Sequence, residues 1–407
     1  MSDAFEIDVG QSDALGASLA RLRFALEKFP GPPRAAAALS ATFDRWRTRD
    51  FSQRRTAVAK IAAALNWSPQ LLDESIDALL APFTRDALTA FASGVVPRKR
   101  LGGFVMPGNV PGAGMHELVI ALLAGTAAMV KTSNREPSFF PAFANTLHQV
   151  DPAVASMLEV TTFGREREDL THLLNKQCDF VVALGDDASL AHLSDAAALF
   201  GFGSRASGAI VSLAPPANLP RLASAVARDV VLFEQQGCLS PHHVFVEEGD
   251  GTTARDFAIA LGEGLSTFAR TLPPAELSMH QAAALRRLRE QARWRGLGGQ
   301  AVELFEGPAM SWTVVLEPAA RFTISPGYRT VTISTIRDGA DLASRLAPLA
   351  KRLEAFALAV PAAVRAKFLD VLAGAGVTYV CDPGNMQSPP LNWPHGGGAF
   401  FDFMATR

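Results

Sequence analysis

Cys238 is the residue whose surroundings best suit nucleophilic chemistry. It follows Gly237 in the stretch 233–243, and an apolar run typical of a strand, 244–246, comes next. A nucleophilic thiol needs an open approach path and a setting that stabilises the thiolate, such as the backbone N–H groups at the start of a helix. A lone cysteine is more often a buried structural residue, so this stretch by itself leaves both interpretations open.

The histidines that follow this cysteine do not predict a metal site. His242 and His243 are adjacent, and a strand points adjacent side chains to opposite faces. No group of cysteines and histidines in the sequence has the spacing of zinc ligands. The three cysteines, Cys178, Cys238 and Cys381, are an odd and sparse set. We therefore expect no metal, no disulfide framework and a reducing compartment.

The composition is that of a soluble globular protein. The 407 residues carry a formal net charge of −2, and 48% of them are hydrophobic. This near-neutral balance gives no reason to expect nucleic acid or an anionic membrane as a partner. The longest apolar run, 118–130, is too short to cross a bilayer, and residues 1–11 lack the apolar core of a signal peptide. We expect a cytoplasmic protein of two or three domains with no membrane insertion.

Short apolar strands alternate with helices from residue 98 onward, after a helical stretch at 12–95. One strand ends in the Gly/Pro/Asn-rich loop 106–114, and the next ends in Lys131 and three small polar residues. Ligands of α/β proteins bind at the carboxyl ends of the strands. The alternation predicts a doubly wound, mostly parallel sheet. The same pattern predicts helices at 188–200, 222–235 and 342–357.

Arginines gather in the N-terminal helical stretch. They are Arg45, Arg47, Arg49, Arg54 and Arg55. Such a group could hold an anion, but a solvated helix face is the interpretation that we favour.

Four stretches occur in an order that is known from one superfamily. They are 106–111, 130–134, 236–238 and 392–397. In turn they resemble the Pro-Trp-Asn-Phe-Pro motif, the Lys-Pro-Ser-Glu motif, the segment that presents the nucleophile and the C-terminal Pro-Phe-Gly-Gly motif of the aldehyde dehydrogenase superfamily. Over residues 98–400 the chain is most similar to the acyl-CoA reductase family, which is typified by the fatty-acid reductase component of bacterial bioluminescence. The resemblance implies an aldehyde-dehydrogenase-like fold of two doubly wound, Rossmann-like domains with a helical N-terminal segment.

The resemblance also implies a chemistry. The Cys238 thiolate would attack a thioester carbonyl, and the Asn109 side-chain amide and the Cys238 backbone N–H would hold the oxyanion. A nicotinamide cofactor would then reduce the thioacyl-enzyme to an aldehyde. The residues that the resemblance places on this cofactor are Met106, Pro107, Gly108, Lys131, Ser133, Asn134 and Gly185. Without the resemblance, Asn109 would be read as a turn residue and Lys131 as a solvated lysine at a strand end.

The residue at position 134 bears on the choice of cofactor. The superfamily often has a glutamate there, which binds both ribose hydroxyls and would repel a 2′-phosphate. This chain has Asn134 instead, with Lys131, Ser133 and Arg135 close by. The substitution favours NADPH and leaves NADH open.

Several departures from the superfamily pattern favour a reductase. The stretch 201–205 stands where aldehyde-oxidising members carry a general-base glutamate, and it has no carboxylate. A thioacyl-enzyme without a water-activating base survives long enough to be reduced. Glu234 remains a candidate base, but a helix-surface glutamate is the interpretation that we favour. Asp186, next to Gly185, would face the cofactor pyrophosphate, so either the cofactor is shifted or Asp186 turns away to cap a helix.

Proton transfer in this chemistry needs a group that titrates near neutral pH. His242, His243 and His395 are the candidates, with a loop or surface histidine as the alternative for each. We prefer His395, because the resemblance brings its Pro/Gly-rich loop near the active site.

We expect three parts: a helical segment at 1–97, a nucleotide-binding domain at 98–230 and a catalytic cysteine domain at 231–407, whose C-terminal loop closes over the cleft. The expected reaction is the NAD(P)H-dependent reduction of a fatty acyl thioester, carried by CoA or an acyl carrier protein, to an aldehyde. A cysteine acyltransferase or thioesterase without a redox step is the alternative. A homodimer is the assembly that we expect, without the usual C-terminal tail contact.

Overall fold

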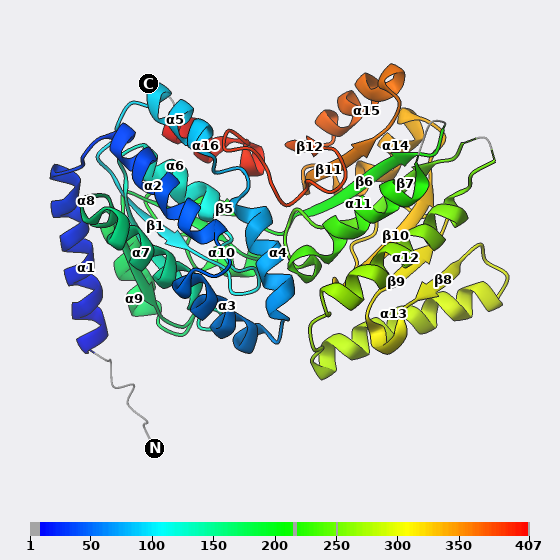
Figure 1. The fold of residues 1–407 in the computed structure, drawn as a ribbon, viewed down its shortest axis with the longest axis horizontal. Coiled ribbons are helices and arrows are strands. Elements are labelled where there is room, and N and C mark those ends of the chain that lie inside the picture. The colour runs from blue at the N-terminus through cyan, green and yellow to red at the C-terminus, as the bar shows by residue number, and fades with distance from the viewer. Residues whose placement is uncertain (1–8, 215–217, 250, 406–407) are drawn as a thin grey trace.

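The computed structural model describes residues 9–214, 218–249 and 251–405 of the chain. Figure 1 shows two lobes side by side, each built on one sheet. Residues 1–8, which form most of the stretch considered as a signal peptide, lie outside the described residues. Within the described ranges, no helix combines the length and the apolar character that a membrane span requires.

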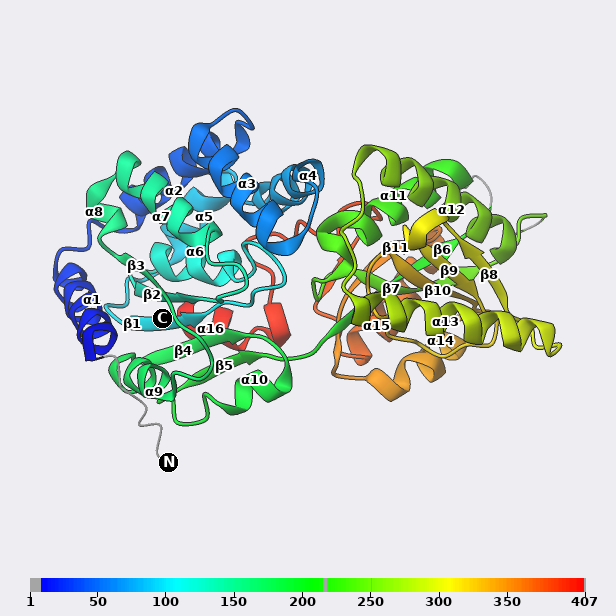
Figure 2. The same ribbon diagram turned by 90° about the horizontal axis from the view of Figure 1, so that it is seen from below.

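The first sheet has five parallel strands in the order β3-β2-β1-β4-β5. These strands are β1 (Leu101–Val105), β2 (Ala127–Thr132), β3 (Leu158–Thr162), β4 (Phe180–Leu184) and β5 (Leu199–Phe202). Parallel neighbours need crossover connections. The helices between them are α6 (Met115–Leu123), α7 (Phe139–Val150), α8 (Pro152–Ala155), α9 (Glu168–Gln177) and α10 (Asp187–Ala191). Figure 2 shows α6 and α7 on one face of this sheet and α9 and α10 on the other, which is the doubly wound arrangement.

The second sheet has seven strands in the order β12-β11-β6-β7-β10-β9-β8. These strands are β6 (Ala206–Ser212), β7 (Pro241–Glu247), β8 (Glu303–Glu306), β9 (Thr313–Leu316), β10 (Thr330–Thr335), β11 (Leu353–Ala359) and β12 (Tyr379–Cys381). Among these described strands, β8 and β9 form an antiparallel pair, and the other neighbouring pairs are parallel. The helices are α11 (Leu219–Val231), α12 (Ala254–Thr271), α13 (Met279–Leu297), α14 (Gly339–Leu346) and α15 (Ala362–Gly374). In Figure 2, α11 and α12 cover one face, and α14 and α15 the other.

The N-terminal helices pack against the first lobe. They are α1 (Val9–Glu27), α2 (Pro32–Arg47), α3 (Ser52–Leu65), α4 (Pro69–Leu80) and α5 (Arg85–Gly94). The sequence marks their starts chemically. The hydroxyls of Ser68 and Thr84 accept the backbone N–H groups of Leu71 and Ala87, which caps α4 and α5.

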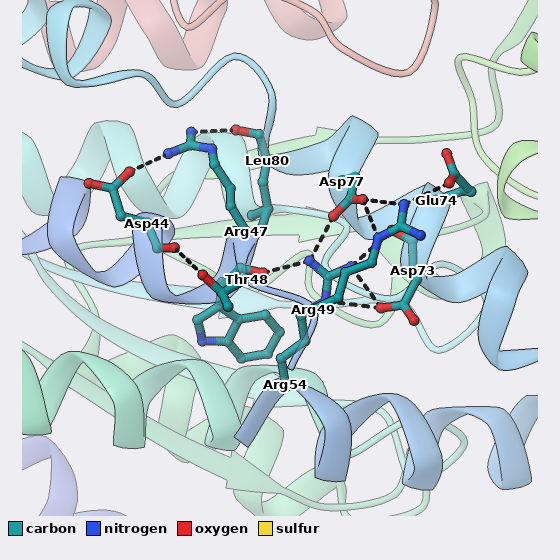
Figure 3. A network of polar contacts seen from close by, with 10 residues as sticks. Asp44, Arg47, Thr48, Arg49, Arg54, Asp73, Glu74, Asp77 and Leu80 are labelled. Atoms are coloured by element: carbon teal, nitrogen blue, oxygen red, sulfur yellow. Dashed lines mark hydrogen bonds and ion pairs between the residues drawn. The ribbon is translucent and has the colours of Figure 1, made fainter. Parts of the chain in front are cut away.

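The arginine group does not form one solvated face. Arg54 is fully buried and pairs with Asp73 and Asp77 of α4 at 2.7 Å each (Figure 3). Arg49 adds contacts to Glu74 and Asp77 at 2.6 Å (Figure 3). The expectation of solvation is therefore wrong for Arg54, because carboxylates of α4 take the place that an external anion would occupy. These pairs fasten α4 to the start of α3.

Two of the predicted helices end much earlier than expected. The helix predicted at 188–200 ends at Ala191, turns follow, and its last two residues begin β5. The helix predicted at 342–357 ends at Leu346, and its residues from Leu353 onward lie in β11, inside the second sheet. A strand buried on both faces is a continuous apolar run, which periodicity cannot distinguish from a buried helix.

The chain changes sheets earlier than we expected. Strand β6 belongs to the second sheet, so the change falls between Phe202 and Ala206 and not near residue 230. The C-terminal segment also returns to the first lobe, where α16 (Ala399–Ala405) lies (Figure 1). The ring of Phe400 packs there against Phe104 and Phe200, with centroids 6.5 and 5.5 Å away. The segment between β12 and α16 therefore runs from the second lobe to the first.

Candidate active site

A cavity of about 1350 Å³ lies at the carboxyl ends of all five strands of the first sheet. The second lobe closes it with the segments that precede β7 and β10 and with the loop that follows β12. Every residue that the sequence assigned to catalysis or to cofactor binding lines this cavity. They are Met106, Pro107, Gly108, Asn109, Lys131, Ser133, Asn134, Gly185, Cys238 and His395.

The chain reaches Cys238 through a strained turn. Helix α11 ends at Val231, and not at residue 235 as predicted. The next residues, Phe233, Glu234 and Gln235, have positive φ angles of 55°, 51° and 59°. Residues other than glycine rarely adopt this conformation, and such strain clusters at functional sites.

Buried hydrogen bonds hold this turn in place. The Gln235 amide donates to the backbone carbonyls of Pro241 and Thr330 at 2.7 and 2.8 Å. The Phe233 backbone N–H donates to the Ser75 hydroxyl of α4 at 3.0 Å. The arginine contacts that hold α4 in place therefore also support the start of the cysteine loop.

Only one of the three cysteines reaches the cavity among the described residues. Cys238 is half-buried and lines it, whereas Cys178 is buried in the core. Burial raises the pKa of Cys178 and of Cys381 to about 12 each, which keeps these two thiols protonated. The Ser207 hydroxyl donates to the Cys238 carbonyl at 2.6 Å and fixes the backbone at the nucleophile.

Glu234 lies in neither of the positions that we considered. Its side chain is 1% exposed and pairs with the fully buried Arg329, Oε1 to Nη2, at 2.5 Å. The backbone N–H of Ala275 donates to the same oxygen. Burial is the reason that the pKa of Glu234 is raised, in spite of Arg329. The interpretation as a helix-surface glutamate is therefore wrong, and Glu234 lies outside the described cavity lining.

Asn109 lies directly opposite the cysteine loop. Its side-chain Nδ2 donates to the backbone carbonyl of Gln236 at 3.1 Å, which ties the first lobe to the loop that presents Cys238. The amide has a second N–H for another acceptor. The preceding Gly108 permits close packing against the segment that follows β2, because a Cβ there would lie 2.4 Å from Ser133 Oγ.

Lys131 ends β2 at the far end of the cavity. Its ammonium nitrogen lies 5.2 Å from the Phe163 ring centroid. Partial burial and the nearby Arg165 lower the pKa of Lys131, while Glu166 acts in the opposite direction. Asp186 caps α10, where it accepts the backbone N–H of Ser189 at 2.7 Å, and it also lines the cavity.

His395 is the most tightly held side chain in the cavity. Its Nδ1 lies 2.6 Å from Glu117 Oε1. Its ring stacks between Phe202 and Trp393, with centroids 4.1 and 4.2 Å away and planes inclined by 16° and 25°. Burial alone would lower the pKa of His395, but the Glu117 charge and hydrogen bonding to Cys238 and Glu117 raise it to about 10.

The other two candidate histidines are held neutral. Burial lowers the pKa of His242 to about 4 and that of His243 to about 3. His242 lines the cavity and contacts the Ser325 hydroxyl at 2.8 Å, whereas His243 points to the opposite side of β7 and contacts Ser334. The adjacent pair lies on opposite faces, as predicted. Across the described ranges, no cluster of three or more His, Cys, Asp or Glu side chains is placed to hold a metal ion.

The groups that hold His395 were not predicted from the sequence. Glu117 lies in α6, whose residues are all buried. A second buried carboxylate, Glu354, accepts the Gly396 backbone N–H at 3.2 Å and pairs with Arg205 at 3.2 Å. A signal for Glu117 was present, because a carboxylate in an otherwise apolar helix needs a specific partner.

Comparisons with known proteins identify the family of the chain. The acyl-CoA reductase (LuxC) family matches residues 95–407. A long-chain acyl-protein thioester reductase of Aliivibrio fischeri is 23% identical over 369 residues, which cover 84% of this chain and 74% of that protein. Another, from Vibrio harveyi, is 23% identical, with 85% and 76% covered.

Solved structures share the fold. An oxidoreductase of Marinobacter aquaeolei superimposes with a TM-score of 0.71 at 15% identity, covering 92% of this chain and 83% of that one. A NAD-dependent benzaldehyde dehydrogenase of Corynebacterium glutamicum gives a TM-score of 0.70 at 14% identity, with 91% and 85% covered. The aldehyde-dehydrogenase-like fold and the family resemblance are thus confirmed: the chain belongs to the acyl-CoA reductase (LuxC) family of enzymes.

Proposed function

We propose that this enzyme reduces a fatty acyl thioester to an aldehyde through an acyl group bound to Cys238. One observation carries the proposal: Cys238, Asn109 and the His395–Glu117 pair meet in one cavity between the two sheets. The family supports the reaction class, and two of its relatives are named long-chain acyl-protein thioester reductases.

The first step forms a bond between Cys238 Sγ and the thioester carbonyl carbon. The negative charge moves to the carbonyl oxygen, where the free N–H of the Asn109 amide and the Cys238 backbone N–H would donate. Among the described residues, none accepts a backbone hydrogen bond from the Cys238 N–H. The carbon–sulfur bond to the carrier then breaks, and the departing thiolate needs a proton.

His395 would supply that proton. Its raised pKa keeps the imidazole charged near neutral pH, so the ring has to donate a proton before it can accept one. The overall reaction consumes one proton for each thioester reduced, and that proton leaves on the free thiol. His395 therefore has to be recharged once in each turnover, and its raised pKa favours recharging from water as soon as the thiol has left, before hydride transfer.

The cavity residues fit a nicotinamide cofactor, which supplies the hydride when it is bound. The cavity extends from Lys131, at the end of β2, to Cys238. Because Asp186 caps α10, the N-terminus of that helix is already occupied, and the diphosphate would have to lie elsewhere in the cavity.

We assign NADPH as the preferred cofactor. Lys131 and Arg165 provide two cations where the 2′-phosphate would bind, and Asn134 supplies no opposing carboxylate. Glu166, a carboxylate near Lys131, works against this assignment. A KM for NADH equal to or lower than that for NADPH would contradict it.

A long acyl chain is the expected substrate, on CoA or on an acyl carrier protein. The names of the relatives support both the chain length and a protein carrier. Apolar side chains that line the cavity near Cys238 include Val110, Phe233 and Trp393. They would contact the first methylene groups of the chain.

The test is NADPH oxidation, followed by absorbance, with a panel of acyl-CoAs for the wild type and Cys238→Ala. We expect thioester-dependent oxidation in the wild type and none in the variant. If no acyl-CoA is turned over, the panel is repeated on acyl carrier protein. Failure of both carriers would contradict the proposal.

The second candidate is a cysteine acyltransferase or thioesterase without a redox step. The contact of Cys238 with a histidine that is held by a carboxylate favours it, because hydrolases use the same order of groups. Acylation of Cys238 without any aldehyde in the presence of NADPH would identify this function.

A further inference from the structure

Glu117 is a carboxylate in an unusual place. It lies in α6, where every residue from Met115 to Leu123 is buried, and it is itself 1% exposed. A buried carboxylate is costly unless a charged or hydrogen-bonding partner compensates it. The compensation comes from 278 residues along the chain, where His395 Nδ1 lies 2.6 Å from Oε1. His395 lowers the pKa of Glu117 in spite of its burial, so the carboxylate is charged.

The surroundings of His395 favour the charged ring. From α6, Glu117 faces it directly, and His116 lies behind, with its Nδ1 3.5 Å from the same carboxylate oxygen. From the cysteine loop, Cys238 faces it. The flat faces of Phe202 and Trp393 cover both sides of the ring and attract a cation.

The other charges near this loop are already neutralised. Arg205 donates to the Gly396 carbonyl at 3.2 Å, and its Nε pairs with Glu354. Glu354 also accepts the Thr378 hydroxyl, which in turn accepts the Trp393 indole N–H. These bonds fix the loop from the second lobe, and Glu117 fixes the ring from the first. Glu117 is the one carboxylate with a described contact to the imidazole.

We infer that Glu117 is a positioning residue that keeps His395 charged beside Cys238, so that the bound acyl group is reduced and not hydrolysed. The inference rests on the proposed function for the identity of the acyl group. Glu117 touches neither substrate nor reacting atoms, and it acts through His395. Because Nδ1 of His395 is bonded to Glu117, the other ring nitrogen is the one that can face the thiol.

The choice between reduction and hydrolysis depends on whether a nearby group can accept a proton from water. Hydrolysis forms a bond between a water oxygen and the acyl carbon, breaks the bond to Cys238 Sγ and requires a base to accept a water proton. An imidazolium has no lone pair for that proton, and the stretch 201–205 offers no carboxylate. A neutral His395, as expected without Glu117, would be a competent base.

The test compares the wild type with Glu117→Gln, the conservative Glu117→Asp and the control Glu136→Gln. Glu136 is a buried carboxylate of the same lobe that caps α7 away from the described cavity lining. The first readout is the rate of Cys238 alkylation by iodoacetamide at pH 6 and pH 9, followed on the Cys238 peptide by mass spectrometry. This readout needs neither substrate nor cofactor.

We expect the ratio of the pH 6 rate to the pH 9 rate to fall about tenfold in Glu117→Gln, because the thiolate loses its charged neighbour. Glu117→Asp should recover part of the ratio, and Glu136→Gln should match the wild type. An unchanged ratio in Glu117→Gln would overturn the positioning role. This result would stand even if no thioester were reduced, so the two proposals fail separately.

The second readout is the release of free fatty acid from tetradecanoyl-CoA without nicotinamide. Glu117→Gln should release about tenfold more fatty acid per acylated Cys238 than the wild type does, as general-base catalysis becomes available. A lower alkylation ratio with no increase in hydrolysis would overturn the claim about reaction outcome. Glu117→Asp should hydrolyse at a rate between the two.

Discussion

Two buried carboxylates, one in the cavity that Cys238 lines and one in the turn that leads to Cys238, have different roles. Glu117 and Glu234 are each 1% exposed, and each pairs with a basic side chain distant in sequence. Glu234 pairs with Arg329, whose guanidinium does not release its proton in proteins. Glu117 pairs with His395, whose imidazole exchanges protons. The two carboxylates are equally buried, so the partner decides whether a pair holds structure or moves protons.

Access to the cavity separates the two pairs as well. His395 and Glu117 line the cavity, whereas Arg329 and Glu234 lie below the cysteine loop, outside the described lining. The backbone there is strained on both sides, because Tyr328 and Arg329 have positive φ angles of 54° and 57°, like those of the loop. The Tyr328 N–H donates to the Glu234 carbonyl at 3.1 Å. The Glu234–Arg329 pair therefore clamps two strained segments together.

The largest effect that we predict is on stability. Arg329→Met leaves the Glu234 carboxylate buried without its cation and should reduce the free energy of unfolding by about 3–5 kcal/mol. Urea denaturation measures this loss, with Glu136→Gln as a matched control for a buried carboxylate. A loss below about 1 kcal/mol would show that the pair is not the clamp described above.

The next effect is on catalysis. His395→Gln keeps a side chain of similar polarity but removes the proton donor, so the rate of thioester-dependent NADPH oxidation should fall about 10²- to 10³-fold. Urea denaturation of the same sample separates this loss from unfolding. Activity within a factor of three of the wild type would mean that His395 is as structural as Arg329.

The two pairs should also differ in their response to pH. The pKa of folded His395, about 10, lies above its ordinary 6.5, so its stabilising contribution is complete below pH 6.5 and is lost as the pH rises through 10. The lowered pKa of Glu117 adds a contribution that is present above its ordinary 4.5 and is lost as the pH falls. The difference in unfolding free energy between the wild type and His395→Phe should therefore be larger at pH 6 than at pH 10, by on the order of 1–2 kcal/mol.

The Arg329 guanidinium stays charged over the same interval. The loss caused by Arg329→Met should thus change less between pH 6 and pH 10 than the loss caused by His395→Phe. Equal changes in the two variants would contradict the distinction between a fixed and a titrating partner.

The smallest effect concerns a cation that belongs to neither pair. Lys131→Met removes one charge from the proposed 2′-phosphate site and should raise the KM for NADPH about tenfold, with kcat nearly unchanged. The KM for NADH should change less, because it lacks that phosphate. A matching increase for both cofactors would place Lys131 outside the 2′-phosphate site.

The sequence was most informative where the chemistry lies in short segments. The motifs at 106–111 and 236–238 are each contiguous in sequence, and residues of both line the cavity. The strand at 353–359 was missed, because a strand buried on both faces has no alternation of apolar and polar residues. The early end of α11 was missed for another reason, since the positive φ angles at 233–235 are imposed by tertiary hydrogen bonds.

The pairing of Glu117 with His395 lay beyond local reasoning. The two residues come from different ends of the chain, and only the return of the C-terminal segment to the first lobe brings them together. Composition gave a partial signal through the single acid of α6. It could not give the partner, because His395 was preferred only for the position of its loop, and nothing in the sequence links that loop to α6.

The central claim is that Cys238 carries the acyl group that is reduced. The most direct measurement is a single turnover, in which the enzyme is mixed with one equivalent of tetradecanoyl-CoA, examined by mass spectrometry and then mixed with NADPH. Our account predicts an acyl group on the Cys238 peptide that disappears on addition of NADPH, with an equal amount of aldehyde formed. An acyl group that persists, or that leaves as free fatty acid, would contradict it.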